Sequence, residues 1–188
     1  MAKGKSKGSA FERQVAKELS LWWTKGKRDD IFWRSQTSGA RATQRKKKGK
    51  TTANQDGDLT AMDVIGQPLI SKLSIELKCG YPAFNLEGVV NRPRAKKTVL
   101  REFLEQCRRE VEGTDRLWWL IVKQNLKEVI LIFPISFNTF LRQRNCLKWK
   151  KLPHLTLKFE EWEITVVRFY EFLQVINPEI FTEGDNEA

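Results

Sequence analysis

A stretch near the middle of the chain places a carboxylate and an ammonium group on one face of an expected strand. Apolar and polar residues alternate strictly from Leu73 to Cys79, and the side chains of a strand point to its two faces in turn. Glu76 and Lys78 therefore share a face, and they lie side by side opposite to the apolar face, which we expect to be buried in the core. No other Asp or Glu in the chain is followed two residues later by Lys.

A second carboxylate, that of Asp58, stands at the start of another expected strand. The pattern predicts strands at 59–65 and 70–79, with a turn at 66–68 between them. We expect these strands to form a hairpin, which brings the start of the first near the end of the second. The carboxylates of Asp58 and Glu76 would then converge.

Converging carboxylates beside a lysine suit the hydrolysis of a phosphodiester. This reaction uses a divalent cation to neutralise the phosphate and to lower the pKa of the attacking water, and Mg²⁺ prefers oxygen ligands. Asp58 and Glu76 would supply such ligands, and Lys78 would orient or help to deprotonate the water and offset the developing negative charge. Taken alone, a Glu-x-Lys pattern is more typical of a structural ion pair on a solvated strand.

The order Asp58, then Glu76, Leu77 and Lys78 at the end of an alternating strand, resembles the metal site of the PD-(D/E)XK nuclease superfamily. The resemblance implies an α/β fold with a mixed central sheet flanked by helices, a restriction-endonuclease-like core. It also implies that Mg²⁺, with Mn²⁺ able to take its place, is held by Asp58, Glu76 and the Leu77 carbonyl.

Two further segments resemble archaeal-type Holliday junction resolvases. Residues 8–13, Gly-Ser-Ala-Phe-Glu-Arg, are similar to their opening helix, which implies that Glu12 is a catalytic and metal-binding residue. Residues 32–40 are similar to their strand and Ser-Gly loop, which places Arg34 and Ser38 at matching positions.

The resemblance covers residues 8–133 and is incomplete. Gly57 stands where that family has a proline, and the C-terminal part of the chain has no counterpart in it. The departure at Gly57 bears mainly on the placement of Asp58.

Some candidate residues also have a structural interpretation. Ser9 and Glu12 match a capping box at the start of an expected helix, so Glu12 has two roles open to it. Asp56 and Asp63 are rival carboxylates, but Asp56 lies in an expected turn and Asp63 on the face opposite to Asp58 if the strand is regular.

Two polar residues outside this set have weaker functional signals. Gln106 loosely matches a position where some superfamily members place a polar site residue, although a surface position on the flank of a helix explains it better. His154, beside a proline in a polar stretch, is expected at the surface.

The charge of the chain indicates a polyanionic partner. There are 34 Lys and Arg against 23 Asp and Glu, a formal net charge of +11, and such an excess favours nucleic acid through counterion release. We expect residues 37–57 to be a loop that holds DNA phosphates, and the candidate DNA contacts are Arg34, Ser38, Arg41, Arg45, Lys46, Lys47, Lys48 and Lys50. Further basic clusters lie at 3–7, 92–97 and 148–151, which suggests an extended ligand rather than a membrane surface.

Length and patterning predict one folded unit with three parts. They are a flexible basic arm at 1–8, a nuclease core at 9–135, and a C-terminal extension at 136–188 that packs on the core and ends in an acidic tail. Within them we expect a helix from Phe11 to Trp22, a short strand at 31–34, a helix at 99–111 ended by Gly113, and strands at 117–122 and 129–133. Beyond these we expect a short helix through Phe140 and two strands at 155–166.

Several classes of site are excluded by composition. One histidine rules out metal centres that need two, and three cysteines without a CxxC pair argue against a disulfide framework or a structural zinc site. The apolar stretches are too short to cross a bilayer. We therefore expect no membrane contact and an intracellular location, cytoplasmic or other.

Together these patterns predict a Mg²⁺-dependent DNA endonuclease, and the resemblance favours a Holliday junction resolvase that acts as a homodimer on branched DNA. A restriction-type or nicking endonuclease on the same core is one alternative. A non-catalytic basic DNA-binding module, in which the carboxylates are structural, is the other.

Overall fold

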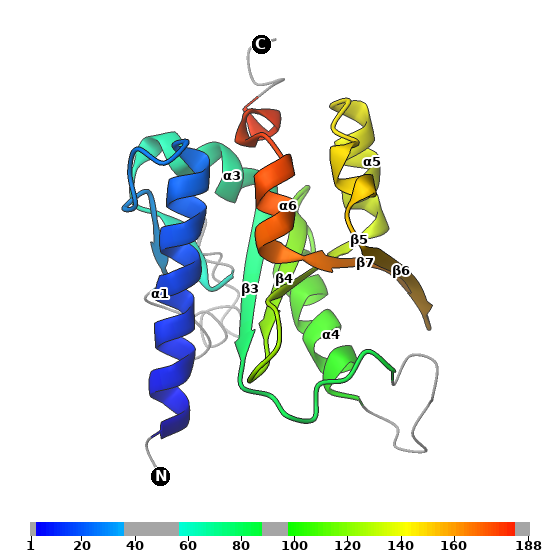
Figure 1. Ribbon diagram of the computed structural model, residues 1–188. Coiled ribbons are helices and arrows are strands. Elements are labelled where there is room, and N and C mark those ends of the chain that lie inside the picture. Colours follow the sequence, from blue (N-terminus) through cyan, green and yellow to red (C-terminus); the bar gives the residue numbers. More distant parts are fainter. Residues whose placement is uncertain (1–2, 36–56, 88–97, 183–188) are drawn as a thin grey trace.

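A mixed five-stranded sheet forms the centre of the structure, a computed structural model that describes residues 3–35, 57–87 and 98–182 (Figure 1). The strands lie in the order β3-β4-β5-β7-β6, with β3 and β4 parallel and the other neighbours antiparallel. They are β3 (Leu73–Cys79), β4 (Leu117–Lys123), β5 (Ile130–Pro134), β6 (His154–Phe159) and β7 (Trp162–Arg168). The α/β class and the mixed sheet predicted above are therefore confirmed.

Helices cover both faces of this sheet. They are α1 (Lys3–Trp23), α3 (Gln67–Lys72), α4 (Val99–Val111), α5 (Ile135–Gln143) and α6 (Phe169–Val175), with short 3-10 turns η1 (Val64–Gly66), η3 (Lys148–Lys151) and η4 (Pro178–Phe181). The helix α4 packs on one face, and the other four helices pack on the opposite face (Figure 1). In the part of the chain that the structure describes, no helix is long and apolar enough to cross a membrane.

Each face of the sheet has its own apolar cluster, because the side chains of a strand alternate. On the face of α1 and α6, the fully buried Trp119 of β4 meets the rings of Phe137, Phe172 and Phe181 edge-on, with centroids 5.5, 5.9 and 6.0 Å apart. Edge-to-face contacts of this kind add to the free energy gained by burial. The rigid sheet that results positions the polar residues at its β3 edge.

The hairpin predicted for residues 59–79 is wrong. The strand β2 (Leu59–Ala61) pairs with β1 (Phe32–Arg34) instead, antiparallel, with Leu59 opposite Arg34. Residues 64–72 then form η1 and α3, because Asp63 caps η1 by accepting from the Ile65 N–H and Pro68 stands in the first turn of α3, a position that suits proline. The Gly-Gln-Pro sequence thus opens a helix and not a turn between strands.

The first helix begins earlier than the capping box predicts. The helix α1 starts at Lys3, inside the segment expected to be a flexible arm, so Ser9 lies within the helix. The predicted interpretation of Glu12 as a capping residue is therefore wrong. Phe11, Val15 and Leu19 are buried on one side of α1, as their spacing predicts.

The C-terminal part contributes strands to the sheet itself. The strand β7 lies between β5 and β6, and the strands predicted at 117–122, 129–133 and 155–166 pair antiparallel as β4 with β5 and β6 with β7. The helices α4 and α5 also lie where the pattern predicts them, whereas α6 was not predicted.

Gly57 permits a close approach between the chain before β2 and the strand β3. Its φ is +103°, and a Cβ added there would lie 3.1 Å from both the N and the O of Ile75. A side chain at this position meets backbone that cannot move aside, and it also adopts a conformation that L residues rarely take. The local packing therefore favours glycine at position 57.

We predict that Gly57→Ala destabilises the protein by about 2 kcal/mol or more, since it adds a backbone clash to the strain of a positive φ. The control is Gly26→Ala, because Gly26 also has a positive φ, +84°, but open space around its Cβ position. Urea unfolding of the two variants measures the difference. Equal destabilisation by both substitutions would contradict the close approach.

Candidate active site

Asp58 is fixed at the outer edge of β3. Its N–H donates to the Ile75 carbonyl at 2.8 Å, and its carbonyl accepts from the Ser35 N–H at 2.7 Å. Its carboxylate Oδ2 accepts from the Leu77 N–H at 2.8 Å. The N–H and C=O of one strand residue point to the same edge, so the Leu77 carbonyl faces Asp58 as well.

Glu76 and Lys78 share a face of β3, as predicted, but that face is not open. The helix α4 covers it, so Glu76 is only 3% exposed and the side chain of Lys78 is 12% exposed. The Lys78 ammonium donates to Glu76 Oε1 and lies 5.2 Å from the centroid of the Phe103 ring. The expectation of a solvated ion pair is therefore wrong, because the alternation of a strand does not show what packs above each face.

Gln106 of α4 joins Glu76 and Lys78 through both ends of its amide. Its Oε1 accepts from the Lys78 ammonium at 2.8 Å, and its Nε2 donates to Glu76 Oε1 at 2.6 Å and to Glu110 Oε1 at 3.1 Å. The preferred expectation of a flanking surface glutamine is wrong.

Glu110 was not predicted as part of this cluster. Its second oxygen, Oε2, accepts from the Ser74 hydroxyl at 3.2 Å. A flipped Gln106 amide would place its oxygen against two carboxylates, so Glu110 and Glu76 together fix its orientation. The spacing of Gln106 and Glu110, four residues apart on a helix, was the signal that could have revealed this.

Glu12 and Arg34 meet beside Asp58. Glu12 Oε2 lies 3.2 Å from Arg34 Nε, an ion pair without hydrogen-bond geometry, so this buried oxygen accepts no hydrogen bond. Burial raises the pKa of Glu12, and the negative charge of Asp58 raises it further, while Arg34 and other cations oppose the rise. The pKa of Glu12 therefore responds to the charge of Asp58, as we expect of two residues in one site.

The central carboxylates repel one another. Burial raises the pKa of Glu76 well above its usual value, and the charges of Asp58 and Glu110 add to the rise, although Lys78 opposes it. Burial likewise raises the pKa of Asp58, against the hydrogen bond from Leu77 and the charge of Lys78. Such a pair holds a proton or a cation in preference to two negative charges.

Lys78 stays charged in this environment. Burial by itself would lower its pKa, but the charges of Glu76 and Asp58 and the hydrogen bond to Glu76 outweigh burial, so its pKa is raised. A protonated lysine donates hydrogen bonds and offsets negative charge, which favours these roles over deprotonation of a water.

The donor set at this edge fits a hard divalent cation. The carboxylates of Asp58, Glu76 and Glu12 and the Leu77 carbonyl are oxygen ligands of the kind that Mg²⁺ takes. The Glu12 oxygen without a hydrogen-bond donor and the mutual repulsion of Asp58 and Glu76 are two observations that a cation would resolve. The residues present therefore fit the group.

The side chains do not stand in a ready metal cage. Within residues 3–35, 57–87 and 98–182, no three or more His, Cys, Asp and Glu side chains are arranged as a metal site. The contacts explain this, because Lys78 and Gln106 occupy Glu76 Oε1 and Glu12 faces Arg34. These contacts and a cation compete for the same carboxylates.

Other candidate residues lie apart from the cluster or outside the described ranges. Asp63 pairs with Arg28 at 2.6 Å and caps η1, and the exposed His154 packs against the Trp149 ring. The following candidates fall outside the residues that the structure describes: Ser38, Arg41, Arg45, Lys46, Lys47, Lys48, Lys50 and Asp56.

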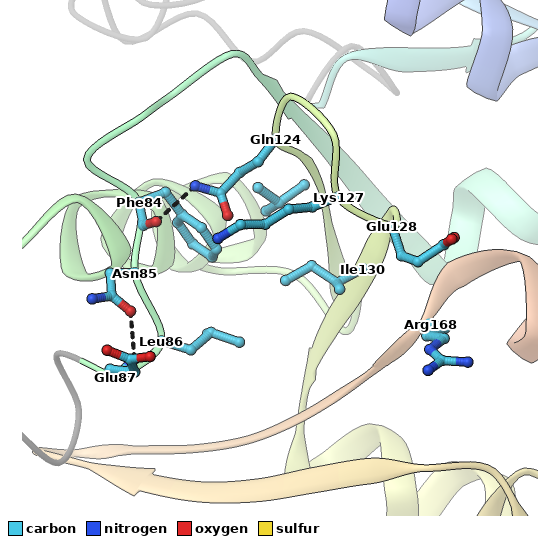
Figure 2. Close-up of a pocket in the computed structure, with 10 residues that line it drawn as sticks. Phe84, Asn85, Leu86, Glu87, Gln124, Lys127, Glu128, Ile130 and Arg168 are labelled. Atoms are coloured by element: carbon cyan, nitrogen blue, oxygen red, sulfur yellow. Dashed lines mark hydrogen bonds between the residues drawn. The ribbon is translucent and has the colours of Figure 1, made fainter.

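A hollow of about 340 Å³ lies elsewhere, beside β4 and β5 (Figure 2). Phe84, Leu86 and Ile130 form its apolar lining, and Lys127 and Glu128 stand among the polar residues around it. Figure 2 shows the hydrogen bond from Gln124 to the Phe84 carbonyl that braces one side. None of the carboxylates described above lines this hollow, so it is not the site of the chemistry.

The fold and this geometry define the class of protein. A mixed sheet whose edge strand carries Glu76-Leu77-Lys78, with Asp58 bonded to its outer edge, is a restriction-endonuclease-like core with the PD-(D/E)XK pattern. The chain belongs to the family described as "Phage putative PDDEXK endonuclease", whose family model matches residues 3–183. The protein is thus a nuclease of this superfamily.

The match includes the segment with β6, β7 and α6, which lacks a counterpart in the resembling resolvases. The family description names no junction resolvase. A search of curated proteins and a search of solved structures each gave no match.

We predict that Asp58→Asn leaves the metal-free protein at least as stable as the wild type, with a gain of about 1 kcal/mol at neutral pH. Asparagine can still accept from the Leu77 N–H, and the substitution removes one of two repelling charges. Urea unfolding in EDTA measures the effect. A loss of more than about 1 kcal/mol would instead make Asp58 a structural anchor.

The sign of the pH dependence follows from the same shifts. The pKa values of Asp58 and Glu76 are higher in the folded chain than in the unfolded chain. At a pH between the unfolded-state and folded-state pKa values, the folded chain therefore binds more protons than the unfolded chain, and stability falls as the pH rises through that range. The advantage of Asp58→Asn should therefore grow as the pH rises above about 4.

Proposed function

We propose that the protein is a metal-dependent DNA endonuclease, most specifically one that resolves four-way junctions. The observation that carries the proposal is the meeting of Asp58, Glu76 and Lys78 at one edge of β3, although Asp58 and Glu76 come from separate elements. A structural ion pair needs only Glu76 and Lys78. It gives no reason for a second, half-buried carboxylate that raises the pKa of the first.

The residues that would hold Mg²⁺ are Asp58, Glu76, the Leu77 carbonyl and Glu12. When bound, the cation supplies charge neutralisation at the phosphate and a lower pKa for the attacking water. Lys78 keeps its proton, orients the water by hydrogen bonding and offsets the charge that builds on the phosphate oxygens. Gln106 holds the Lys78 ammonium in place at 2.8 Å.

DNA is the substrate that the charge and the chain path support. The basic segment 36–56 leaves the described part of the chain after Ser35 and returns at Gly57, and both of these residues adjoin Asp58 through a hydrogen bond or a peptide bond. The described residues on either side of the segment that carries Arg41 to Lys50 are thus both anchored beside Asp58. Arg34, beside Glu12, is one-third exposed and can reach a phosphate.

The contact between Glu12 and Arg34 favours a junction as the particular substrate. The two segments that resemble archaeal-type resolvases, 8–13 and 32–40, meet through these side chains at the site. A resolvase must cut two opposed strands, so this function carries with it a homodimer with two such sites. A restriction-type enzyme on the same core would use identical chemistry on linear DNA.

The test is the cleavage of a labelled four-way junction and a matched linear duplex, with Mg²⁺, Mn²⁺ or EDTA. We expect paired symmetric cuts in the junction alone, with none in EDTA and a loss of at least about 100-fold in Asp58→Asn. Asp63→Asn is the matched control, because Asp63 pairs with Arg28 away from the site, and it should cut like the wild type.

The outcomes separate the alternatives. Cleavage of both DNAs would keep the nuclease chemistry and remove the junction preference. Binding without cleavage under every metal condition would contradict the proposal and support a DNA-binding module. Equal loss in Asp63→Asn would mean that Asp58 has no special role.

A further inference from the structure

A basic surface lies on the C-terminal part of the chain, at the end of α5 and along η3. It comprises Arg142, Lys148, Lys150 and Lys151, all exposed, and we call it the η3 surface. There is no Asp or Glu between Glu128 and Glu160 in the sequence. The positive charge of this surface is therefore not balanced by its own segment.

The η3 surface rests on a rigid base. Trp149, between the lysines, is 2% exposed and packs on Phe133 with ring centroids 5.8 Å apart. The turn is closed by hydrogen bonds from the Cys146 N–H to the Leu141 carbonyl at 2.8 Å and from the Leu152 N–H to the Trp149 carbonyl at 2.9 Å. The lysines are thus held on a fixed backbone, and only their side chains must be ordered when a ligand binds.

The four cations of the η3 surface make no ion pair with any carboxylate in the described ranges. Some other exposed cations do have such partners, as in the pairs Lys17–Asp29, Lys25–Glu179 and Arg168–Glu171. Isolated like charges on a rigid surface repel one another, and a polyanion would relieve that repulsion.

The η3 surface lies far from the active site. The site is on β3, at one edge of the five-stranded sheet, whereas η3 leads into β6 at the other edge. Four spacings of about 4.8 Å separate these edge strands, roughly 19 Å in all. Figure 1 shows α5 and β6 on the side of the molecule opposite to α1.

We propose that the η3 surface binds the phosphate backbone of a second stretch of DNA, outside the stretch that is cut. The inference rests on the proposed function, because it takes DNA as the polyanion. DNA carries one charge per about 1.7 Å of duplex, so a ligand that extends across the sheet meets both edges. Substrate would then be held at two separate places, and long or branched DNA would gain most.

A membrane surface fits the η3 surface less well. Binding to a bilayer needs a continuous apolar face beside the charges. Here Phe137 and Leu141 of α5 and Trp149 of η3 are all buried in the core, and the exposed large apolar residues that the structure describes in this part of the chain are Ile135, Leu147 and Leu155. The charge without an apolar face favours phosphodiesters in water.

The experiment measures the affinity for a 30-base-pair duplex in EDTA, over a series of salt concentrations, with the full chain. The triple variant Lys148→Ala/Lys150→Ala/Lys151→Ala should bind about 10-fold more weakly than the wild type. Each lost phosphate contact should reduce the slope of log affinity against log salt by about 0.9. An unchanged thermal midpoint verifies that the variant is folded.

The matched control is Lys17→Ala/Lys25→Ala/Arg168→Ala, which removes the same charge from residues that have carboxylate partners. Equal weakening by both triple variants, or affinity and salt slope unchanged in the η3 variant, would overturn the inference. So would η3-dependent binding to phosphatidylcholine vesicles containing phosphatidylserine that exceeds binding to DNA. Binding in EDTA does not depend on cleavage. Failure of the inference about the η3 surface can therefore be distinguished from failure of the proposed nuclease function.

Discussion

The site depends on two carboxyl groups, those of the half-buried Asp58 and the buried Glu76, which are held close together at one edge of the sheet. Taking both out of water as anions is costly, and neighbouring groups offset the cost only in part. Lys78 and Gln106 contact Glu76 from β3 and α4, and the Leu77 N–H contacts Asp58. The pKa of Glu76 still lies well above its usual value because of burial and the adjacent charges. A fold that keeps such an arrangement has a site that a cation would stabilise.

The convergence of Asp58, Glu76 and Lys78 was predicted better than the path of the chain that joins them. Glu76 and Lys78 share a face because strand side chains alternate, and that rule needs no tertiary information. The hairpin was wrong, yet Asp58 still reaches β3, because Gly57 lets the preceding chain lie against Ile75. The burial of the polar face could not be predicted, since it depends on where α4 packs.

Gln106 and Glu110 are a second case in which an element was predicted but its tertiary contacts were not. Both lie on a helix that was predicted correctly, and their spacing places them on one side of it. Their role appears only when that side is found to face Glu76 and Lys78. The C-terminal part likewise could not be placed from the sequence, because its strands join the sheet through pairing with β5. With that pairing the sheet separates the candidate active-site edge from the basic η3 surface.

A crystal structure of the protein grown with Mn²⁺, with anomalous scattering recorded at the manganese edge, would test whether the carboxylates hold a cation. We predict an anomalous peak between the carboxylates of Asp58 and Glu76, within ligand distance of the Leu77 carbonyl, and no peak there in Asp58→Asn. Absence of a peak at saturating Mn²⁺, with the contacts of Glu76 to Lys78 and Gln106 unchanged, would contradict it. The two carboxylates would then belong to a structural network and not to a metal site.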